Sequence, residues 1–332
     1  MNPDGVTIVL DARGVDLVGS TPFHKFCQMM RRQKKALHWR FQHVEFMGME
    51  DGNENHLLHA PYDVKISHQF QLVIVADHNS SRVKFFDLKT KEFLTSWVFT
   101  YPNALVVENG TEEHLVVGGD TVQKFALRAV RENSQEQPMW NYAKSSINGL
   151  CVKVVKGGNN LIYVCSGDLW SQFEITVLNS RTGLVVQQFG SHHHNIYSPR
   201  GRKIVLGSVS RIGFLRNGTM VISSGEGHCI KMFKEHDNAL HRIRSFGQYG
   251  KKKTSFHYPR GVVIDECSQN ILICDSWNDR LQLFDQELNL LYSFTKGPKQ
   301  KTFRTPLSAC IDHSTGKLYV AYSGDKYLSI LE

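Results

Sequence analysis

The alternation of apolar and polar residues predicts a chain built almost entirely of short β-strands. Residues 60–87 and 258–285 both show an alternating run, a short polar turn, a continuous apolar run, a polar loop and a second alternating run. Alternation is typical of half-buried strands, and a short continuous apolar run fits a strand buried on both faces. Each stretch therefore predicts three consecutive strands of one sheet.

The two stretches are copies of one another. "ADHNSSRVKFFD" (76–87) matches "CDSWNDRLQLFD" (274–285), with an aspartate, an arginine and a final Phe-Asp pair at the same positions. Catalysis needs such a group once, whereas a structural unit repeats it. We therefore predict that the Asp/Arg pairs satisfy loop amides and pack at the junctions between units; the residues are Asp77, Arg82, Asp275 and Arg280.

Weaker copies of the same strand order fill the rest of the chain, at residues 101–127, 146–190, 210–234 and 305–331. Six units at a period of roughly 40–50 residues are typical of propeller blades. The last unit has three strands, and residues 36–48 form an orphan strand pattern ahead of the first. We expect the orphan strand to complete the last blade, which closes the ring and leaves no long sheet edge. The predicted fold is an all-β, six-bladed β-propeller over residues 37–332.

The repeat also resembles a known family. "PRGVVIDECSQNILICDSWNDRLQLFD" and its first copy are similar to NHL repeats, whereas the middle units depart from the pattern: Ser224 and Cys229 replace the Asp and Arg in the fourth. The resemblance implies six blades around a central channel. Members include the substrate- or RNA-binding ends of RING and B-box ubiquitin ligases, a zinc-dependent amidating lyase and secreted hydrolases, so the fold leaves the function open. This chain has no RING or B-box cysteine and histidine pattern.

Three basic segments, 191–203, 250–260 and 296–304, are each predicted to join the outer strand of one blade to the inner strand of the next. Such connections emerge on one face. The candidate partner-binding residues are Arg200, Arg202, Lys203, Lys251, Lys252, Lys253, His257, Tyr258, Arg260, Lys296, Lys299, Lys301 and Arg304.

Positive charge and flat rings suit the phosphates and unstacked bases of single-stranded RNA. Exposed loops are also lysine-rich for solubility. The equivalent loop at 48–61 is acidic, and the net charge of +8 permits an anionic partner without requiring one. An uneven charge distribution fits an oriented partner, either protein or RNA.

Histidines supply the candidate metal ligands. His192 and His194 are close in sequence, but neighbouring side chains of an extended segment point to alternate sides, and no acidic or cysteine partner lies nearby. His228 stands where a lyase-like ligand could fall, yet the equivalent residues in the two best repeats are Ser81 and Asp279. We therefore predict no metal, no cofactor and no catalytic residue.

The remaining features concern compartment and the N-terminus. Seven cysteines without a C-x-x-C pair favour reduced thiols, which is typical of a cytoplasmic or nuclear protein. No secretory leader pattern and no apolar run of about 18 residues is present. Within the extension at 1–36, residues 22–36 predict a short amphipathic helix that packs on the propeller or, alternatively, docks on a partner or membrane surface; its apolar stripe is Phe23, Phe26, Cys27 and Met30.

These observations favour a non-catalytic, monomeric recognition scaffold that binds a protein partner through the face with the loops between blades. One alternative is single-stranded RNA on the basic sectors of that face. The other is a lyase- or hydrolase-type enzyme with a metal at the channel mouth.

Overall fold

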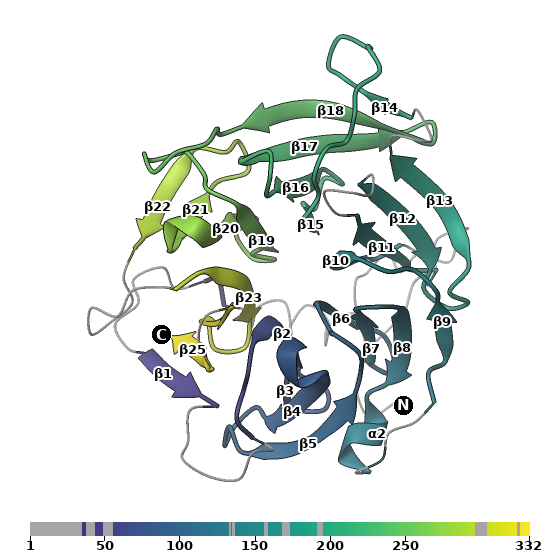
Figure 1. Ribbon diagram of the computed structural model, residues 1–332, viewed down its shortest axis with the longest axis vertical. Coiled ribbons are helices and arrows are strands. Elements are labelled where there is room, and N and C mark those ends of the chain that lie inside the picture. The colour runs from purple at the N-terminus through teal and green to yellow at the C-terminus, as the bar shows by residue number, and fades with distance from the viewer. Residues whose placement is uncertain are drawn as a thin grey trace, which may run out of the picture.

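The computed structural model describes residues 35–37, 44–48, 56–132, 134, 137–155, 159–167, 173–190, 195–295, 304–323 and 326–332. Six sheets of four or five strands are arranged around one axis (Figure 1). The last sheet is completed by β1 (Val44–Met47), which pairs antiparallel with β25 (Leu328–Leu331). The all-β, six-bladed propeller with an N-terminal closing strand is confirmed.

Each blade follows the chain from its inner to its outer strand. Blade 1 contains β2 (Pro61–Ser67), β3 (Leu72–Asp77), β4 (Arg82–Asp87) and β5 (Phe93–Val98). Blade 2 contains β6 (Ala104–Glu108), β7 (His114–Gly118), β8 (Val122–Ala126) and β9 (Trp140–Tyr142). Blade 3 contains β10 (Ile147–Lys153), β11 (Leu161–Ser166), β12 (Glu174–Asn179) and β13 (Val185–Gly190).

The second half of the ring has one extra strand. Blade 4 contains β15 (Arg211–Phe214), β16 (Met220–Ser224), β17 (Cys229–His236) and β18 (Ala239–Phe246), with β14 (Ile196–Tyr197) added outside β18. Blade 5 contains β19 (Pro259–Ile264), β20 (Ile271–Asp275), β21 (Arg280–Phe284) and β22 (Leu290–Phe294). Blade 6 joins β23 (Pro306–Asp312), β24 (Lys317–Tyr322) and β25 to β1. Short helices lie at η1 (His78–Ser80), α2 (Arg128–Arg131) and η2 (Ser276–Asn278).

The two ends of the blades differ. Because successive strands of each blade run antiparallel, the loops between second and third strands emerge at the same end as the connections between blades. We call this end the loop face and the opposite end the turn face. Three loops between second and third strands reverse through a left-handed residue, with φ of 49° at Ser81, 48° at His228 and 51° at Asp279. These three residues occupy equivalent positions.

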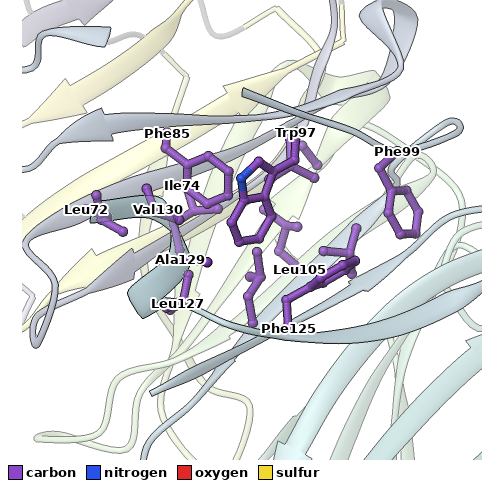
Figure 2. Packing of buried hydrophobic residues seen from close by; sticks show 14 residues of the cluster. Leu72, Ile74, Phe85, Trp97, Phe99, Leu105, Phe125, Leu127, Ala129 and Val130 are labelled. Carbon is purple, nitrogen blue, oxygen red and sulfur yellow. The ribbon is translucent and has the colours of Figure 1, made fainter. Parts of the chain in front are cut away.

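The core lies between the blades. In the described part of the chain, buried apolar side chains form six clusters, one at each junction of neighbouring blades. Figure 2 shows the cluster between blades 1 and 2, where the Trp97 ring lies 4.6 Å from that of Phe85 and 5.4 Å from that of Phe125. Each apolar strand face is thus removed from water by the next blade. A closed ring of packed blades fixes the positions of the loops around the channel.

The segment ahead of the closing strand contacts the turn face. The Lys35 amide donates to the His313 oxygen at 2.7 Å, and buried Leu37 packs in the cluster between blades 5 and 6. The helix predicted over 22–36 lies outside the described residues except for residues 35 and 36, which are not helical. The domain boundary at residue 36 stays a prediction. Within the described ranges no helix has the length and apolar character needed to cross a membrane.

Candidate binding site at the channel mouth

Asp275 and Arg280 hold the loop before blade 5 in place. Both side chains are buried, and the Arg280 Nε donates to the Asp275 carboxylate at 2.7 Å. Asp275 also accepts the His257 amide at 2.7 Å. The terminal nitrogens of Arg280 donate at 3.0, 2.9 and 2.7 Å to three main-chain oxygens of the loop, those of Lys251, Lys252 and Ser255. With its donors directed to the loop, this arginine positions a basic segment and leaves the side chains of Lys251 and Lys252 exposed.

The first copy of the motif uses a different cation. Asp77 accepts the amides of His59 and Ala60 at 2.9 and 2.8 Å, but its ion partner, at 2.9 Å, is Lys84. Arg82 donates instead to the Ser96 hydroxyl at 3.2 Å. The two arginines that align in sequence therefore have different contacts.

A polar residue two positions further along the third strand contacts the loop before its blade in three blades. Lys84 donates to the Leu57 oxygen, Lys231 to the Leu206 oxygen and Gln282 to the Ser255 oxygen. The sequence analysis missed this contact. The sequence does carry a sign of this contact: a polar residue interrupts an otherwise buried strand, 25 to 27 residues after the residue whose oxygen it contacts.

His228 is a hydrogen-bond acceptor in the structure. Its Nδ1 accepts the Tyr258 amide at 3.1 Å, just as Asp279, the equivalent residue in blade 5, accepts the Thr305 amide at 2.8 Å. Burial, and then the charge of His257, lower the pKa of His228 below its usual value. The contact joins blade 4 to the loop before blade 5. His192 and His194 lie outside the described residues.

One group of described residues combines metal-ligand types on the turn face. Ligand atoms of Asp265, Cys267 and His313 lie within 4.8 Å of one another. The Asp265 carboxylate, however, already accepts from the Leu37 and Cys267 amides and from the Ser268 hydroxyl. A similar arrangement recurs one blade further, where Asp312 caps its own turn and lies 3.6 Å from His68. Turn capping accounts for this group.

Four cysteines of blades 3, 5 and 6 are poor nucleophiles. Burial raises the pKa of the Cys151 and Cys274 thiols to about 12 and that of Cys310 to about 11. It also raises the pKa of Cys165. Because the thiolate is the reactive form, these side chains act as small core residues. All six cysteines in the described part of the chain are free thiols.

The predicted basic segments do not share one surface. Lys251, Lys252 and Lys253 are exposed on the loop face, as is Arg304 before blade 6. The placement expected for the first segment needs correction over its described residues, 195–203: β14 pairs in parallel with β18 at the outer edge of blade 4 (Figure 1), and a bridge joins Lys203 to Tyr197 of β14. Because β14 adds to the outer edge of the sheet, three residues of this segment lie away from the central channel, namely Arg200, Arg202 and Lys203. Outside the described residues lie Lys296, Lys299 and Lys301.

A cavity of about 390 Å³ opens at the channel mouth on the loop face. All six blades contribute to its wall, from the first residues of their inner strands and from the loops beside them. The lining includes Tyr62 and His78 of blade 1, Asn103 of blade 2, Phe173 of blade 3, Arg211 and Glu226 of blade 4, Tyr258 and Arg260 of blade 5, and Leu307 of blade 6.

Two arginines face this cavity in different electrostatic settings. Arg211 reaches across the channel to Asp63 of the opposite blade at 3.6 Å and donates to the Asn103 oxygen at 2.7 Å. Arg260 has no carboxylate or carbonyl partner among the described residues; its guanidinium lies 5.7 Å from the centre of the Tyr258 ring. Burial, and then the charge of Arg211, lower the pKa of Arg260 below its usual value. Sequence reasoning included Arg260 with the basic loop and missed Arg211.

Aromatic side chains lead from the surface to Arg260. Trp277 is 55% exposed and stacks on Tyr258, with ring centres 4.7 Å apart and an angle of 19°. Tyr249, 65% exposed, and His257 complete the group beside His228. We call these five residues the rim cluster. It borders both the cavity and the exposed lysines of the loop before blade 5.

The fold and the cavity define a six-bladed β-propeller with a cationic, aromatic channel mouth. No family model matches the chain, and no curated protein matches it either. The resemblance to NHL repeats therefore stays a prediction.

Several solved structures are similar in fold. A streptogramin B lyase is 10% identical over 89% of this chain and 98% of that chain, with a TM-score of 0.57. A hydrazine synthase chain from Kuenenia stuttgartiensis is 13% identical over 85% of this chain and 97% of that chain, with a TM-score of 0.55. A protein of unknown function from Bacteroides thetaiotaomicron is 12% identical over 87% and 75% of the two chains, with a TM-score of 0.60. At this level of identity the likeness shows the fold alone.

Proposed function

We propose that this propeller is a non-catalytic recognition scaffold that binds a protein partner on its loop face. The observation that carries the proposal is the rim cluster, in which exposed Trp277 and Tyr249 stand on a rigid frame next to a cavity. Tyrosine and tryptophan are enriched among the residues that dominate protein interfaces. Arg280 fixes the loop that follows Tyr249, and the Trp277 amide donates to the His257 oxygen of the same loop at 3.0 Å, so little ordering entropy opposes binding.

Affinity capture from the native cell tests this proposal. We expect the double variant Tyr249→Ala, Trp277→Ala to lose the protein partners that the unchanged chain retains. Tyr292→Ala is the matched control, because Tyr292 is also an exposed tyrosine of this region, 43% exposed on the outer strand of blade 5. Equal retention by both variants, or loss only with Tyr292→Ala, would place the interface elsewhere.

Single-stranded RNA is a second candidate on the same face. It is favoured by the exposed lysines at 251–253, which flank exposed rings able to stack with bases. The Arg280 guanidinium holds the main chain of this loop, so we expect substitutions of the lysine side chains to leave the loop conformation unchanged.

Salt-dependent binding of short RNAs tests the second candidate. We expect Lys252→Glu to weaken binding and to reduce the slope of log affinity against log salt by about one if one phosphate contact is lost. Lys89→Glu, the same exchange at an exposed residue of the turn face, should leave both quantities unchanged. Absence of binding at low salt would remove RNA as a partner.

A further inference from the structure

Three cations of the described inner strands do not each have a carboxylate of their own. Lys65 is 2.6 Å and Arg211 3.6 Å from the shared carboxylate of Asp63, which is 2% exposed. Arg260 is the third, and no carboxylate among the described residues pairs with it. A partly buried cation without a counter-ion is unfavourable, and an anion that reaches it gains an interaction strengthened by the low local dielectric.

One acidic residue, Glu226, also lines the cavity. It belongs to the loop between β16 and β17, and the described structure has no ion pair between it and Arg260. Glu226 therefore does not neutralise Arg260. It would instead repel an anion that enters the cavity.

The walls next to Arg260 are flat rings. Tyr258 lies beside the guanidinium and stacks on the ring of Trp277. Tyr62 stacks with His78 at 4.3 Å and an angle of 17°, which fixes the orientation of its ring. The volume of about 390 Å³ lies within the range of small-molecule sites, roughly 300 to 1,000 Å³. An anion alone would leave most of this space and the ring surfaces unused.

We propose that the channel mouth binds a small anion in which a carboxylate or phosphate is joined to a planar ring. Arg260 pairs with the anionic group, because a guanidinium offers two parallel donors to either oxyanion. Tyr62 and Tyr258 contact the planar part. This site goes beyond the proposed recognition of a protein, since it requires only the cavity and holds whether or not a macromolecule docks on the loop face.

Ligand-observed saturation-transfer NMR at low ionic strength tests the site, with benzoate and phenyl phosphate as probes. We expect saturable binding of at least one of them and none of benzamide, which has the ring without the charge. Arg260→Gln should weaken binding by about tenfold to a hundredfold, as the loss of a charged hydrogen bond predicts. Arg181→Gln, the same exchange at an exposed arginine of the turn face, should leave affinity unchanged.

A second variant keeps the test decisive if Arg260→Gln does not fold. Glu226→Gln removes the carboxylate at the cavity and should raise the affinity of both anions about threefold. Tighter binding of phenyl phosphate identifies a phosphate ligand, and tighter binding of benzoate a carboxylate ligand. The proposal is overturned if neither anion binds, if benzamide binds as well as they do, or if neither Arg260→Gln nor Glu226→Gln changes the affinity.

Discussion

The junctions before blades 1 and 5 are built on equivalent aspartates but use different cations. In the described part of the loop before blade 1, Asp77 and Lys84 contact Leu57, His59 and Ala60. In the loop before blade 5, Arg280, the partner of Asp275, donates to the main-chain oxygens of Lys251 and Lys252. Asn278 donates to the Gly250 oxygen. A lysine is a point charge, whereas the guanidinium fork donates in several directions.

The Arg280 guanidinium therefore holds three main-chain oxygens of its loop, whereas the Lys84 ammonium holds one among the described residues. At the junction before blade 5 the fixed backbone leaves three lysines exposed next to the rim cluster and the cavity. The repeated motif that looked purely architectural thus sets the geometry of the candidate interface. Variants that remove one cation at a time test this difference.

Arg280→Met should have the largest effect. It leaves the Asp275 carboxylate buried without its cation and removes the donors of three main-chain oxygens, so we expect a loss of about 3 to 5 kcal/mol in the free energy of unfolding. Urea denaturation measures it. The aligned arginine is the control: Arg82 is half-buried and contacts only Ser96 in the described structure, so Arg82→Met should cost about 1 kcal/mol or less. Equal losses would mean that sequence alignment, and not the observed contacts, identifies the structural arginine.

Lys84→Met should have an intermediate effect, about 2 kcal/mol, because Asp77 keeps the amides of His59 and Ala60 and the Ser80 hydroxyl as donors. Burial opposes ionisation of Asp77, but these hydrogen bonds and the Lys84 charge outweigh it, so its pKa lies below its usual value of 3.8.

The acid limb of the stability curve measures the same contact. A depressed carboxyl pKa stabilises the fold above pH 3.8, and this stabilisation is lost as the pH falls through the folded pKa. Without Lys84 the pKa of Asp77 rises toward its usual value, so the stability lost on acidification should be smaller, and its loss complete at a higher pH, than in the unchanged chain. Identical acid limbs in thermal unfolding scans would show that Lys84 does not set the ionisation of Asp77.

The sequence predicted the fold because the information is local and repeated. Strand alternation and the copies around Asp77 and Asp275 were enough for six blades, and the orphan strand predicted the closure by β1. The partners at the channel were not predictable in this way. Arg211 meets Asp63 across the channel although 148 positions separate them in sequence (211 − 63), and the lack of a partner for Arg260 is a property of the assembled ring. Likewise, alternation places residues 82 and 84 on the same side of a strand and cannot say which one reaches Asp77.

The smallest expected effect is a difference in pH dependence between two equivalent hydrogen-bond acceptors on either side of blade 5. His228 accepts the Tyr258 amide and Asp279 accepts the Thr305 amide. Because the pKa of His228 lies below 6.5, its contribution is complete above that pH and is lost as the pH falls through the folded pKa, when protonated Nδ1 no longer accepts. A carboxyl group keeps an acceptor oxygen in either protonation state.

Hydrogen exchange at single amides, corrected for the intrinsic pH dependence, measures this difference. On acidification we expect the Tyr258 amide to lose protection worth about 1 kcal/mol, while the Thr305 amide keeps its own. His228→Asp places the same acceptor in both blades and should abolish the pH step at Tyr258. If both amides lose protection together, the loosening is global and His228 has no special part in it. If Tyr258 alone responds, the ring that borders Arg260 depends on an acceptor that titrates, and affinity for anions at the channel mouth should change over the same pH range.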